Sequence, residues 1–249
     1  SSGIVLFLCP NQSIVMQLFF QENISEPISS LSEEESKHLI RVLRKKQGDS
    51  IQLTDGQGMI YETVILDANP KRATLKILSK KQALQDPFYI HLAIAPTKSP
   101  DRMEWMVEKI TEIGFHELTL IETNNSERSF LKTDRLIKKI ISACKQSLKF
   151  HRPKVNETRK LNDLIKDNEF TDFQKFIAYV DKNHTNHLFD LATPKSNYLV
   201  LIGPEGDFDS TEIKFAIEAN FSPVSLGNSR LRTETAGLAA VQMLQVLNR

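Results

Sequence analysis

The pattern of apolar and polar positions changes once along the chain, near residue 84. Residues 50–82 contain short runs in which apolar and polar positions alternate, as around Ile51 and Leu53, and Asp55-Gly56 and Asn69-Pro70 separate these runs. A period of two predicts strands with one buried face, and the two dipeptides are turn signals. We therefore expect a small β-barrel-like domain over residues 16–84.

A helix is expected near the start of this domain, over residues 32–44. Ser32 is followed three residues later by Glu35, which is the spacing of a capping box, and Gly48 lies beyond the expected end. In an α-helix, positions i, i+4, i+7 and i+8 share a face, and here they are occupied by Lys37, Arg41, Arg44 and Lys45. Such a row of cations suits a run of phosphates.

From residue 88 onward, short apolar runs alternate with helical patterns. Strands are expected at "YIHLAIA", "ELTLIE", "KFIAYV", "YLVLIG" and "SPVSLG". The segment "SPDRMEWMVEKITEIG" predicts a helix with Ser99 as N-cap and Gly114 as its stop, and "TETAGLAAVQMLQVL" predicts the last helix. This alternation indicates an α/β domain with a largely parallel sheet over residues 88–249, joined to the first domain by "ALQDP".

Composition narrows the class of protein only slightly. The 249 residues are 25% charged with a net charge of +1, which argues against a strongly cationic nucleic-acid binder but leaves room for a local basic patch. Cys9 and Cys144 lack the spacing of a zinc site or of a disulfide framework, so we expect no metal and a reducing, cytoplasmic location.

The first fifteen residues do not fit either domain. Ile4–Leu8 is too short to span a bilayer and has no basic residue before it, so we expect neither a membrane segment nor a signal peptide. Ser1–Gly3 resembles an expression remnant, Met16 is a candidate native start, and residues 4–15 are then a leader. The alternative is an extra strand.

Two glycine-containing loops follow predicted strands of the α/β domain. The first is "GPEGDFDST", in which Asp209 and Glu212 have the spacing of a capping box, and the second is "LGNSRLRTETAG", which carries Arg230, Arg232 and Glu234. Ligands of parallel sheets bind beyond the carboxyl ends of strands, and glycine allows the backbone to approach them. A pair of tight turns is the alternative interpretation. Because neither a G-x-G-x-x-G nor a P-loop pattern is present, a ligand held mainly by backbone groups is expected.

These segments carry a family resemblance. "LIGPEGDFDSTE" and "VSLGNSRLRTETA" resemble the carboxyl-terminal signature of the SPOUT-class methyltransferases that act on N3 of a uridine in 16S ribosomal RNA of the small subunit. "KSPDRMEWMVEKITEIG", "MQLFF" and "HLIRVLRKKQGDSIQLTDGQG" are similar to other segments of the same family, so the resemblance extends from Met16 to Arg249. The chain departs from the family pattern at Asp207, where a third glycine is usual.

The resemblance implies a trefoil-knotted carboxyl-terminal domain, an amino-terminal domain similar to PUA RNA-binding modules, and a homodimer formed through the knot domain. It also implies S-adenosylmethionine as cofactor and 16S ribosomal RNA, in the assembled small subunit, as partner. Carried over by position, the cofactor-binding residues are Ile202, Gly203, Gly206, Leu226, Gly227, Leu231, Arg232, Thr233 and Thr235.

Methylation of uracil N3 requires loss of its proton, so a positive charge beside a uracil oxygen is expected. Arg232 or Arg230 is the candidate for this role, and Glu234 or Glu205 is the candidate proton acceptor, although either carboxylate can equally hold a helix start or pair with an arginine. Lys98 and Arg102 follow a strand end and are candidate RNA contacts.

A second basic segment competes with the amino-terminal cations for the role of RNA surface. Residues 128–154 contain nine Lys or Arg and one acid, and we expect a helix there with Ile137, Ile140, Ile141, Cys144 and Leu148 buried. A solvated helix face is the plain alternative for such a run.

Two further functions remain open at this level. A nucleotide-binding oxidoreductase is disfavoured by the missing glycine fingerprint. A non-catalytic, RNA-binding knotted dimer, or a related methyltransferase with another RNA target, differs from the main hypothesis in activity and not in fold.

Overall fold

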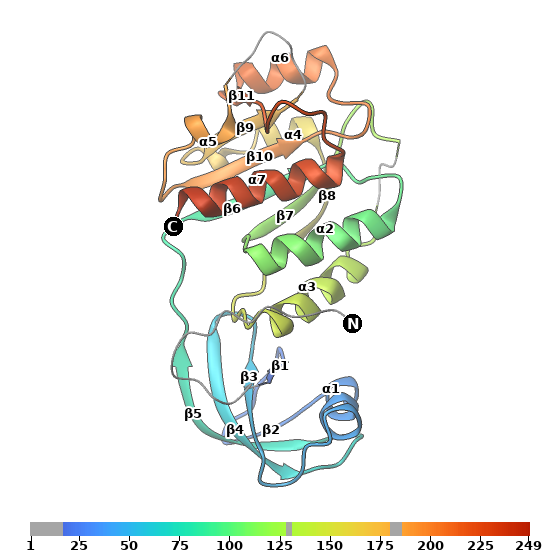
Figure 1. The fold of residues 1–249 in the computed structure, drawn as a ribbon, viewed down its shortest axis with the longest axis vertical. Coiled ribbons are helices and arrows are strands. Elements are labelled where there is room, and N and C mark those ends of the chain that lie inside the picture. Colours follow the sequence, from blue (N-terminus) through green and yellow to red (C-terminus); the bar gives the residue numbers. More distant parts are fainter. Residues whose placement is uncertain (1–16, 128–130, 180–185) are drawn as a thin grey trace. The chain divides into compact units, whose positions relative to one another are not determined.

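A computed structural model describes residues 17–127, 131–179 and 186–249 (Figure 1). The expected leader, residues 1–15, lies outside the described residues. The chain forms two compact units, the first ending at Ala83 and the second beginning at Leu84.

The first unit is built on a five-stranded sheet with the order β1-β3-β4-β5-β2. Its strands are β1 (Leu18–Phe20), β2 (Ile28–Ser30), β3 (Ser50–Thr54), β4 (Met59–Asp67) and β5 (Thr74–Gln82). β1 and β3 are parallel and the other pairs are antiparallel. Ile51 and Leu53 are fully buried, as their alternation with polar residues predicts, and they pack in one core with Phe19 and Leu75.

The predicted amino-terminal helix is shorter than expected and changes type along its length. It starts as α1 (Glu33–Lys37), where the Ser32 hydroxyl accepts a hydrogen bond from the Glu35 amide at 3.2 Å, so the predicted N-cap is confirmed. It continues as a π-helical turn, η1 (His38–Val42), and stops there. Arg44 has a φ of 55°, a left-handed conformation that no helix continues through.

This ending changes the expected row of cations. A π-turn holds more residues per turn than an α-helix, and Arg44 and Lys45 lie beyond the helix end, so the α-helical spacing does not align the four side chains. Lys37, Arg41 and Arg44 are exposed, and the Lys37 ammonium lies 2.6 Å from the Glu33 carboxylate. The prediction of one continuous face is therefore wrong, whereas the exposure of these cations agrees with it.

The second unit contains a six-stranded parallel sheet with the order β11-β9-β10-β6-β7-β8. Its strands are β6 (Tyr89–Ile94), β7 (Glu117–Glu122), β8 (Lys154–Lys160), β9 (Gln174–Ala178), β10 (Asn197–Ile202) and β11 (Ser222–Val224). The parallel sheet expected from the apolar runs is therefore present. β8 has no buried residue, and this explains why hydrophobic periodicity did not reveal it.

Helices cover both faces of this sheet (Figure 1). One core contains residues of α2 (Pro100–Ile113), α3 (Asp134–Gln146), α5 (Leu188–Leu191) and α7 (Thr233–Leu247), and the other contains residues of α4 (Leu161–Ile165), η2 (Asn168–Phe170) and α6 (Ser210–Glu218). α7 lies very close to α2, since a Cβ at Gly237 would meet the Met106 sulfur at 2.8 Å. The glycine in the middle of α7 is thus a packing requirement.

The expected buried stripe on α3 is partly wrong. Leu136, Ile140, Ala143 and Cys144 are the buried residues, and Leu148 is 51% exposed. The helix ends at Gln146 and Leu148 takes a φ of 55°, so the helical spacing does not extend to it.

No helix in the described part of the chain has the length and apolarity that crossing a membrane requires. The same residues include no group of three or more His, Cys, Asp or Glu side chains arranged to hold a metal ion.

A buried polar cluster lies between the sheet and η2. His91 on β6 has no exposed surface, and its Nε2 lies 2.7 Å from the Thr119 hydroxyl. Glu117 on β7 accepts hydrogen bonds from Tyr89 at 2.9 Å and Asn156 at 2.6 Å. Polar groups in such a place are stable only when they are partnered, so these contacts fix the pairing of the three strands.

Burial controls the protonation of this cluster. Desolvation lowers the pKa of His91 to about 4, so the imidazole is neutral at pH 7. Burial alone would raise the pKa of Glu117, but the neighbouring His91, Lys154 and Asn156 outweigh it and the net shift is downward.

We predict that this cluster makes the protein acid-sensitive. Below pH 6.5 the unfolded state binds a proton at His91 that the folded state excludes until about pH 4, so the free energy of unfolding falls over that interval and levels off below it. The expected loss is about 3 kcal/mol. Urea unfolding at a series of pH values measures it.

The matched variant is His91→Gln, which keeps hydrogen-bonding capacity toward Thr119 without titrating. Its stability should fall less steeply between pH 6.5 and 4. A residual slope is expected in both proteins, because burial also lowers the pKa of His116. Equal slopes in the two proteins would contradict the role assigned to His91.

Candidate functional site

The carboxyl ends of four adjacent strands lie level with one another. In the parallel pairing, Ile202 at the end of β10 is opposite Ile94 of β6 and Ala178 of β9, and Ala178 is opposite Val224 of β11. The loops that follow these strands therefore emerge at one edge of the sheet. In open α/β sheets this edge is where ligands bind.

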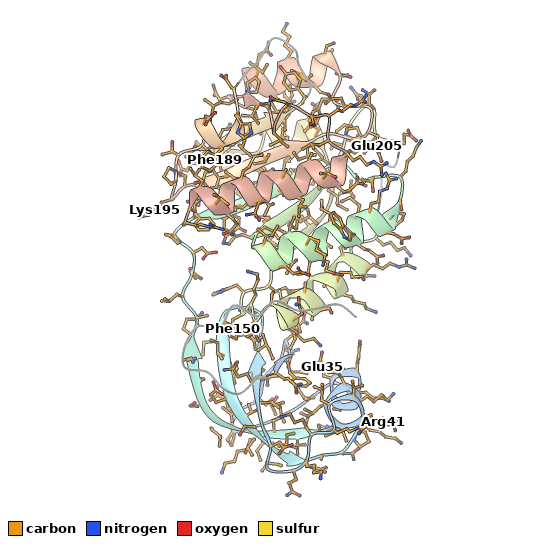
Figure 2. The ribbon with its side chains drawn as sticks, viewed as in Figure 1. Glu35, Arg41, Phe150, Phe189, Lys195 and Glu205 are labelled. Atoms are coloured by element: carbon orange, nitrogen blue, oxygen red, sulfur yellow. The ribbon has the colours of Figure 1, made fainter. Side chains whose placement is uncertain are left out.

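A cavity of about 690 Å³ lies at this edge. Its wall is made by residues 178–179 at the end of β9, residues 202–205 and Asp207 from the end of β10 onward, and the continuous segment 224–233 from the end of β11 to the start of α7, with Ala236 of α7. Glu205, labelled in Figure 2, marks the loop after β10. The volume lies within the range of about 300–1,000 Å³ that is usual for small-molecule sites.

A second cavity, of about 520 Å³, lies at the opposite, amino-terminal ends of β9 and β11. It contains none of the residues expected to bind a ligand. The position of the first cavity relative to the sheet therefore makes it the candidate site.

The two glycine loops are joined by a buried hydrogen bond. The Thr233 hydroxyl, at the first residue of α7, donates to the Gly203 carbonyl oxygen at 3.1 Å. Thr233 is 5% exposed, so the bond is shielded from water. It fixes the start of α7 against the end of β10, and the cavity lies between the two loops.

The structure gives packing reasons for the first two glycines. A Cβ at Gly203 would meet the buried Phe208 ring at 3.1 Å, and one at Gly206 would meet the Asn125 Cβ at 3.3 Å. Gly203 lines the cavity, whereas Gly206 does not. Close approach of a ligand is therefore not needed to account for either residue.

Backbone conformation explains the residue type at two other positions of these loops, 227 and 207. Gly227 has a φ of 125°, and nothing lies within 4 Å of the place where its Cβ would be. Asp207 has a φ of 63°, in the left-handed region that glycine adopts freely and aspartate tolerates. The departure from the family glycine at this position therefore leaves the backbone path intact.

The loop after β10 is anchored by the capping box expected at Asp209. Asp209 Oδ1 accepts hydrogen bonds from the amides of Thr211 and Glu212, each at 2.8 Å, and Glu212 Oε2 accepts from the Asp209 amide at 3.0 Å. Hydrogen bonds from Thr211 and Asn124 lower the pKa of Asp209 to about 2. The cap therefore remains charged throughout the physiological range.

The loop after β7 supports the same segment from outside the cavity. The Asn124 amide donates to Glu212 Oε1 at 2.8 Å, and Asn125 Nδ2 donates to the Asp207 carbonyl oxygen at 3.1 Å. The sequence pattern did not predict a role for these two asparagines. Their position just after a strand of the parallel sheet was the only available signal.

Positive charge lines one side of the cavity. Arg230 and Arg232 are both exposed and both lie in its wall, and neither guanidinium has a hydrogen-bond or ion-pair partner among the described residues. Glu205 also lies in the wall, and its Oε1 accepts a hydrogen bond from the Lys98 amide at 3.2 Å. The arginines are thus available to a ligand, while the Glu205 carboxylate already fixes the loop after β6.

The remaining charged candidates pair with acids. The Lys98 ammonium forms an ion pair with Glu127. Arg102 Nε lies 3.8 Å from Oε1 of Glu234, which is only 7% exposed and is outside the cavity wall. The other oxygen, Oε2, is buried without a hydrogen-bond partner in the described structure.

Most of the residues expected to hold a cofactor come together in this cavity. Those in its wall are Ile202, Gly203, Leu226, Gly227, Leu231, Arg232 and Thr233, whereas Gly206 and Thr235 are not part of it. Tyr179 and Asn228 also line it and were not anticipated, because no local pattern distinguishes them.

We predict that Thr233→Val destabilises the second unit by about 1 kcal/mol, since the isosteric side chain cannot donate to the Gly203 carbonyl. Thr233→Ser keeps the hydroxyl and is the matched control. Urea denaturation measures the two midpoints. If the valine variant were as stable as the serine variant, the hydrogen bond would have no measurable role.

Comparisons with known proteins agree with this arrangement. A family model described as an RNA methyltransferase domain matches residues 84–245, and one described as an RNA methyltransferase PUA domain matches residues 31–78. The matched ranges fall on the two structural units.

Individual relatives match over nearly their whole length. The crystal structure of a probable rRNA-methyltransferase from Porphyromonas gingivalis is 41% identical, with a TM-score of 0.88, and the match covers 94% of this chain and 98% of that one. A ribosomal RNA small subunit methyltransferase E from Neisseria gonorrhoeae, bound to S-adenosyl methionine, is 28% identical, with a TM-score of 0.84 and the same coverage. A protein of that name from Buchnera aphidicola subsp. Schizaphis graminum is 27% identical over 94% of this chain and 95% of its own.

The RNA methyltransferase model alone accounts for well over half of the chain, and the cavity lies within the residues that it matches. This protein therefore belongs to the RNA methyltransferase family, with a PUA-type domain preceding its methyltransferase domain.

Proposed function

We propose that the protein transfers the methyl group of S-adenosylmethionine to N3 of a uridine in 16S ribosomal RNA of the small subunit. The observation that carries this proposal is the cavity between the two loops at the carboxyl ends of β10 and β11, in a chain of the RNA methyltransferase family. Relatives named for the small ribosomal subunit support the choice of substrate.

The cavity fits this cofactor by its chemistry. The glycines Gly203 and Gly227 line it together with the apolar residues Ile202, Leu226 and Leu231, which suits an adenosine held by its edges and faces. S-adenosylmethionine supplies an electrophilic methyl group on a sulfonium sulfur. The residues that would hold it are those of the cavity wall.

The arginines account for activation of the base. Uracil N3 becomes a good nucleophile once its proton leaves, and the negative charge then spreads onto O2 and O4. A guanidinium stays charged at every relevant pH and presents fixed donors to such oxygens. Arg232, at the N-cap of α7, and Arg230 are the unpartnered cations in the cavity wall. We assign the stabilising role to Arg232.

We assign the role of proton acceptor to Glu234, provided that a movement of the protein exposes its buried carboxylate. Its carboxylate is buried beside Arg102 and is not part of the cavity wall, so it would reach the base only through movement of Arg102 or of the start of α7. Glu205 is held by the Lys98 amide and is the less available carboxylate.

The RNA would be bound by cations of both units. Lys37, Arg41, Arg44 and Lys45 belong to the PUA-type domain, and Lys98 and Arg102 belong to the methyltransferase domain. These contacts need not be collinear, because phosphate contacts add up along a flexible single strand or loop. We also retain a trefoil knot in the carboxyl-terminal methyltransferase domain and a cytoplasmic location as parts of the proposal.

A homodimer through the methyltransferase domain is the remaining part. Trp105, the single tryptophan of the chain, lies on α2 and is 46% exposed, and α7 beside it carries the half-buried Leu238, Met243 and Leu247. Large exposed aromatic side chains are typical anchors of protein interfaces. This surface supports a second copy as the partner.

The function is tested by incubating the protein with methyl-labelled S-adenosylmethionine and small subunits from cells that lack the gene, then identifying the labelled nucleoside. Label in 3-methyluridine is expected. Binding of S-adenosylmethionine without any labelled nucleoside would favour the non-catalytic alternative, and label in another nucleoside would move the target.

In the same assay, Arg232→Ala should lower kcat/KM by about 100-fold, the usual cost of removing one group that stabilises a developing negative charge. Lys214→Ala is the control, since Lys214 is exposed on α6 away from the cavity wall. Activity of the Arg232 variant within a few-fold of the wild type would remove Arg232 from the mechanism.

The dimer is tested with Trp105→Glu, which places a charge on the proposed interface. The variant should sediment as a monomer at concentrations where the wild type is a dimer, with a dissociation constant raised at least about 100-fold. Sedimentation equilibrium measures this constant. A wild-type monomer, or an unchanged dimer in the variant, would rule out this surface.

A further inference from the structure

The Asn125 side chain holds the two peptide groups that flank Asp207. Its Nδ2 donates a hydrogen bond to the Gly206 carbonyl oxygen at 3.4 Å and another to the Asp207 carbonyl oxygen at 3.1 Å. The first oxygen belongs to the peptide group before the Asp207 Cα, and the second belongs to the peptide group after it. Because φ and ψ describe how these two planar groups are turned about the Cα, one side-chain amide fixes the backbone conformation of Asp207.

The conformation that Asn125 fixes is unfavourable for aspartate. Asp207 has a φ of 63°, in the left-handed region where a Cβ crowds the backbone and which glycine, without a Cβ, adopts freely. A local hydrogen bond relieves part of this cost, since Asp207 Oδ1 accepts from the Phe208 amide at 2.8 Å. The rest has to be offset by contacts from outside the loop.

Asn125 belongs to a turn that is anchored independently of Asp207. In the preceding residue, the Asn124 amide donates to Glu212 Oε1 at 2.8 Å, and Asn124 Nδ2 donates to Asp209 Oδ2 at 2.5 Å. Both acceptors belong to the capping box at the start of α6. The turn after β7 is therefore fixed against α6, and Asn125 imposes a conformation on Asp207 without depending on it.

The conformation of Asp207 reaches the cavity wall through its neighbours. Its amide donates to the Pro204 carbonyl oxygen at 3.0 Å, which closes the turn of the loop after β10. The next residue, Phe208, is 5% exposed, and its ring lies 3.1 Å from the place where a Cβ of Gly203 would be. Because Gly203, Pro204 and Asp207 all line the cavity, a different φ at Asp207 would change the shape of that wall.

We propose that Asn125 is a positioning residue for the cofactor, which keeps Asp207 in the left-handed conformation and so maintains the loop shape that binds S-adenosylmethionine. The inference rests on the proposed function, in which this cofactor occupies the cavity. Asn125 is not part of the cavity wall and acts through the loop after β10, without touching the ligand. The turn after β7 thus contributes to cofactor affinity from outside the cofactor site.

The chain allows the hydrogen bonds and the backbone cost to be varied separately. Asn125→Ala removes the donor, and Asn125→Asp keeps the shape of the side chain but directs an oxygen at the two carbonyl oxygens. Asp207→Gly removes the conformational cost, because glycine adopts a φ of 63° without strain. Asn162→Ala, on exposed α4 outside the cavity wall, is the control for loss of an asparagine side chain.

The experiment is isothermal titration of the full-length wild type and variants with S-adenosylmethionine. Asn125→Ala should raise the dissociation constant about fivefold, as loss of one hydrogen bond does, and Asn125→Asp should raise it at least as much. In a chain that already carries Asp207→Gly, the further change Asn125→Ala should raise the constant by less than about twofold. Asn162→Ala should bind like the wild type.

Urea unfolding of the same proteins distinguishes positioning from a general structural role. A general loss of stability would lower the unfolding midpoint and the affinity by the same amounts whether residue 207 is aspartate or glycine. Positioning predicts instead that glycine at 207 restores most of the affinity that Asn125→Ala removes.

The outcomes separate this inference from the proposed function. If the wild type and Asn125→Ala bind S-adenosylmethionine equally well, Asn125 has no positioning role and the proposed cofactor stands. If Asn125→Ala weakens binding equally with aspartate and with glycine at 207, Asn125 does not act through the Asp207 conformation and the inference is overturned. If the wild type does not bind S-adenosylmethionine, the proposed cofactor itself is wrong and the inference falls with it.

Discussion

The site depends on the register of one parallel sheet. Because Ile94, Ile202, Ala178 and Val224 are level across β6, β10, β9 and β11, the loops that follow these strands emerge side by side and enclose a cavity. The hydrogen bond from Thr233 to the Gly203 carbonyl then closes the loop after β11 against the loop after β10. A shift of one residue in β10 would turn its apolar side chains to the opposite face and move its loop away from the others.

At the carboxyl edge of this sheet, most polar contacts hold the loops in place, and only a few side chains remain available for chemistry. Asp209, Glu212, Asn124 and Asn125 all use their polar atoms on one another or on the backbone of the loop after β10. The two arginines of the loop after β11 have no hydrogen-bond or ion-pair partner among the described residues. This division between supporting and available groups is what preorganisation of a catalytic site requires, since charges that are already oriented need not reorganise during the reaction.

Sequence alone predicted the parts of this arrangement that depend on local signals. The Asp209 capping box, the apolar strand β10 and the parallel sheet follow from short-range spacing, and each is present. The polar edge strand β8 and the packing reason for Gly206 depend on contacts between residues far apart in the chain. The Asn125 side chain that crowds Gly206 is an example, because 81 positions separate the two residues. The π-turn after α1 and the contact of Gly203 with Phe208 are local, but no spacing rule marks them. The roles of individual site residues came from family resemblance, and the cavity wall contains most but not all of them.

The central claim is that the cavity at the carboxyl edge of the sheet holds the methyl donor. A crystal structure of the protein with S-adenosylmethionine tests it most directly. The account predicts the ligand between residues 202–205 and 226–233, with its methyl group facing the side of the cavity that carries Arg232. A ligand at the amino-terminal edge, in the cavity beside Lys175, or no bound ligand at saturating concentration, would contradict it.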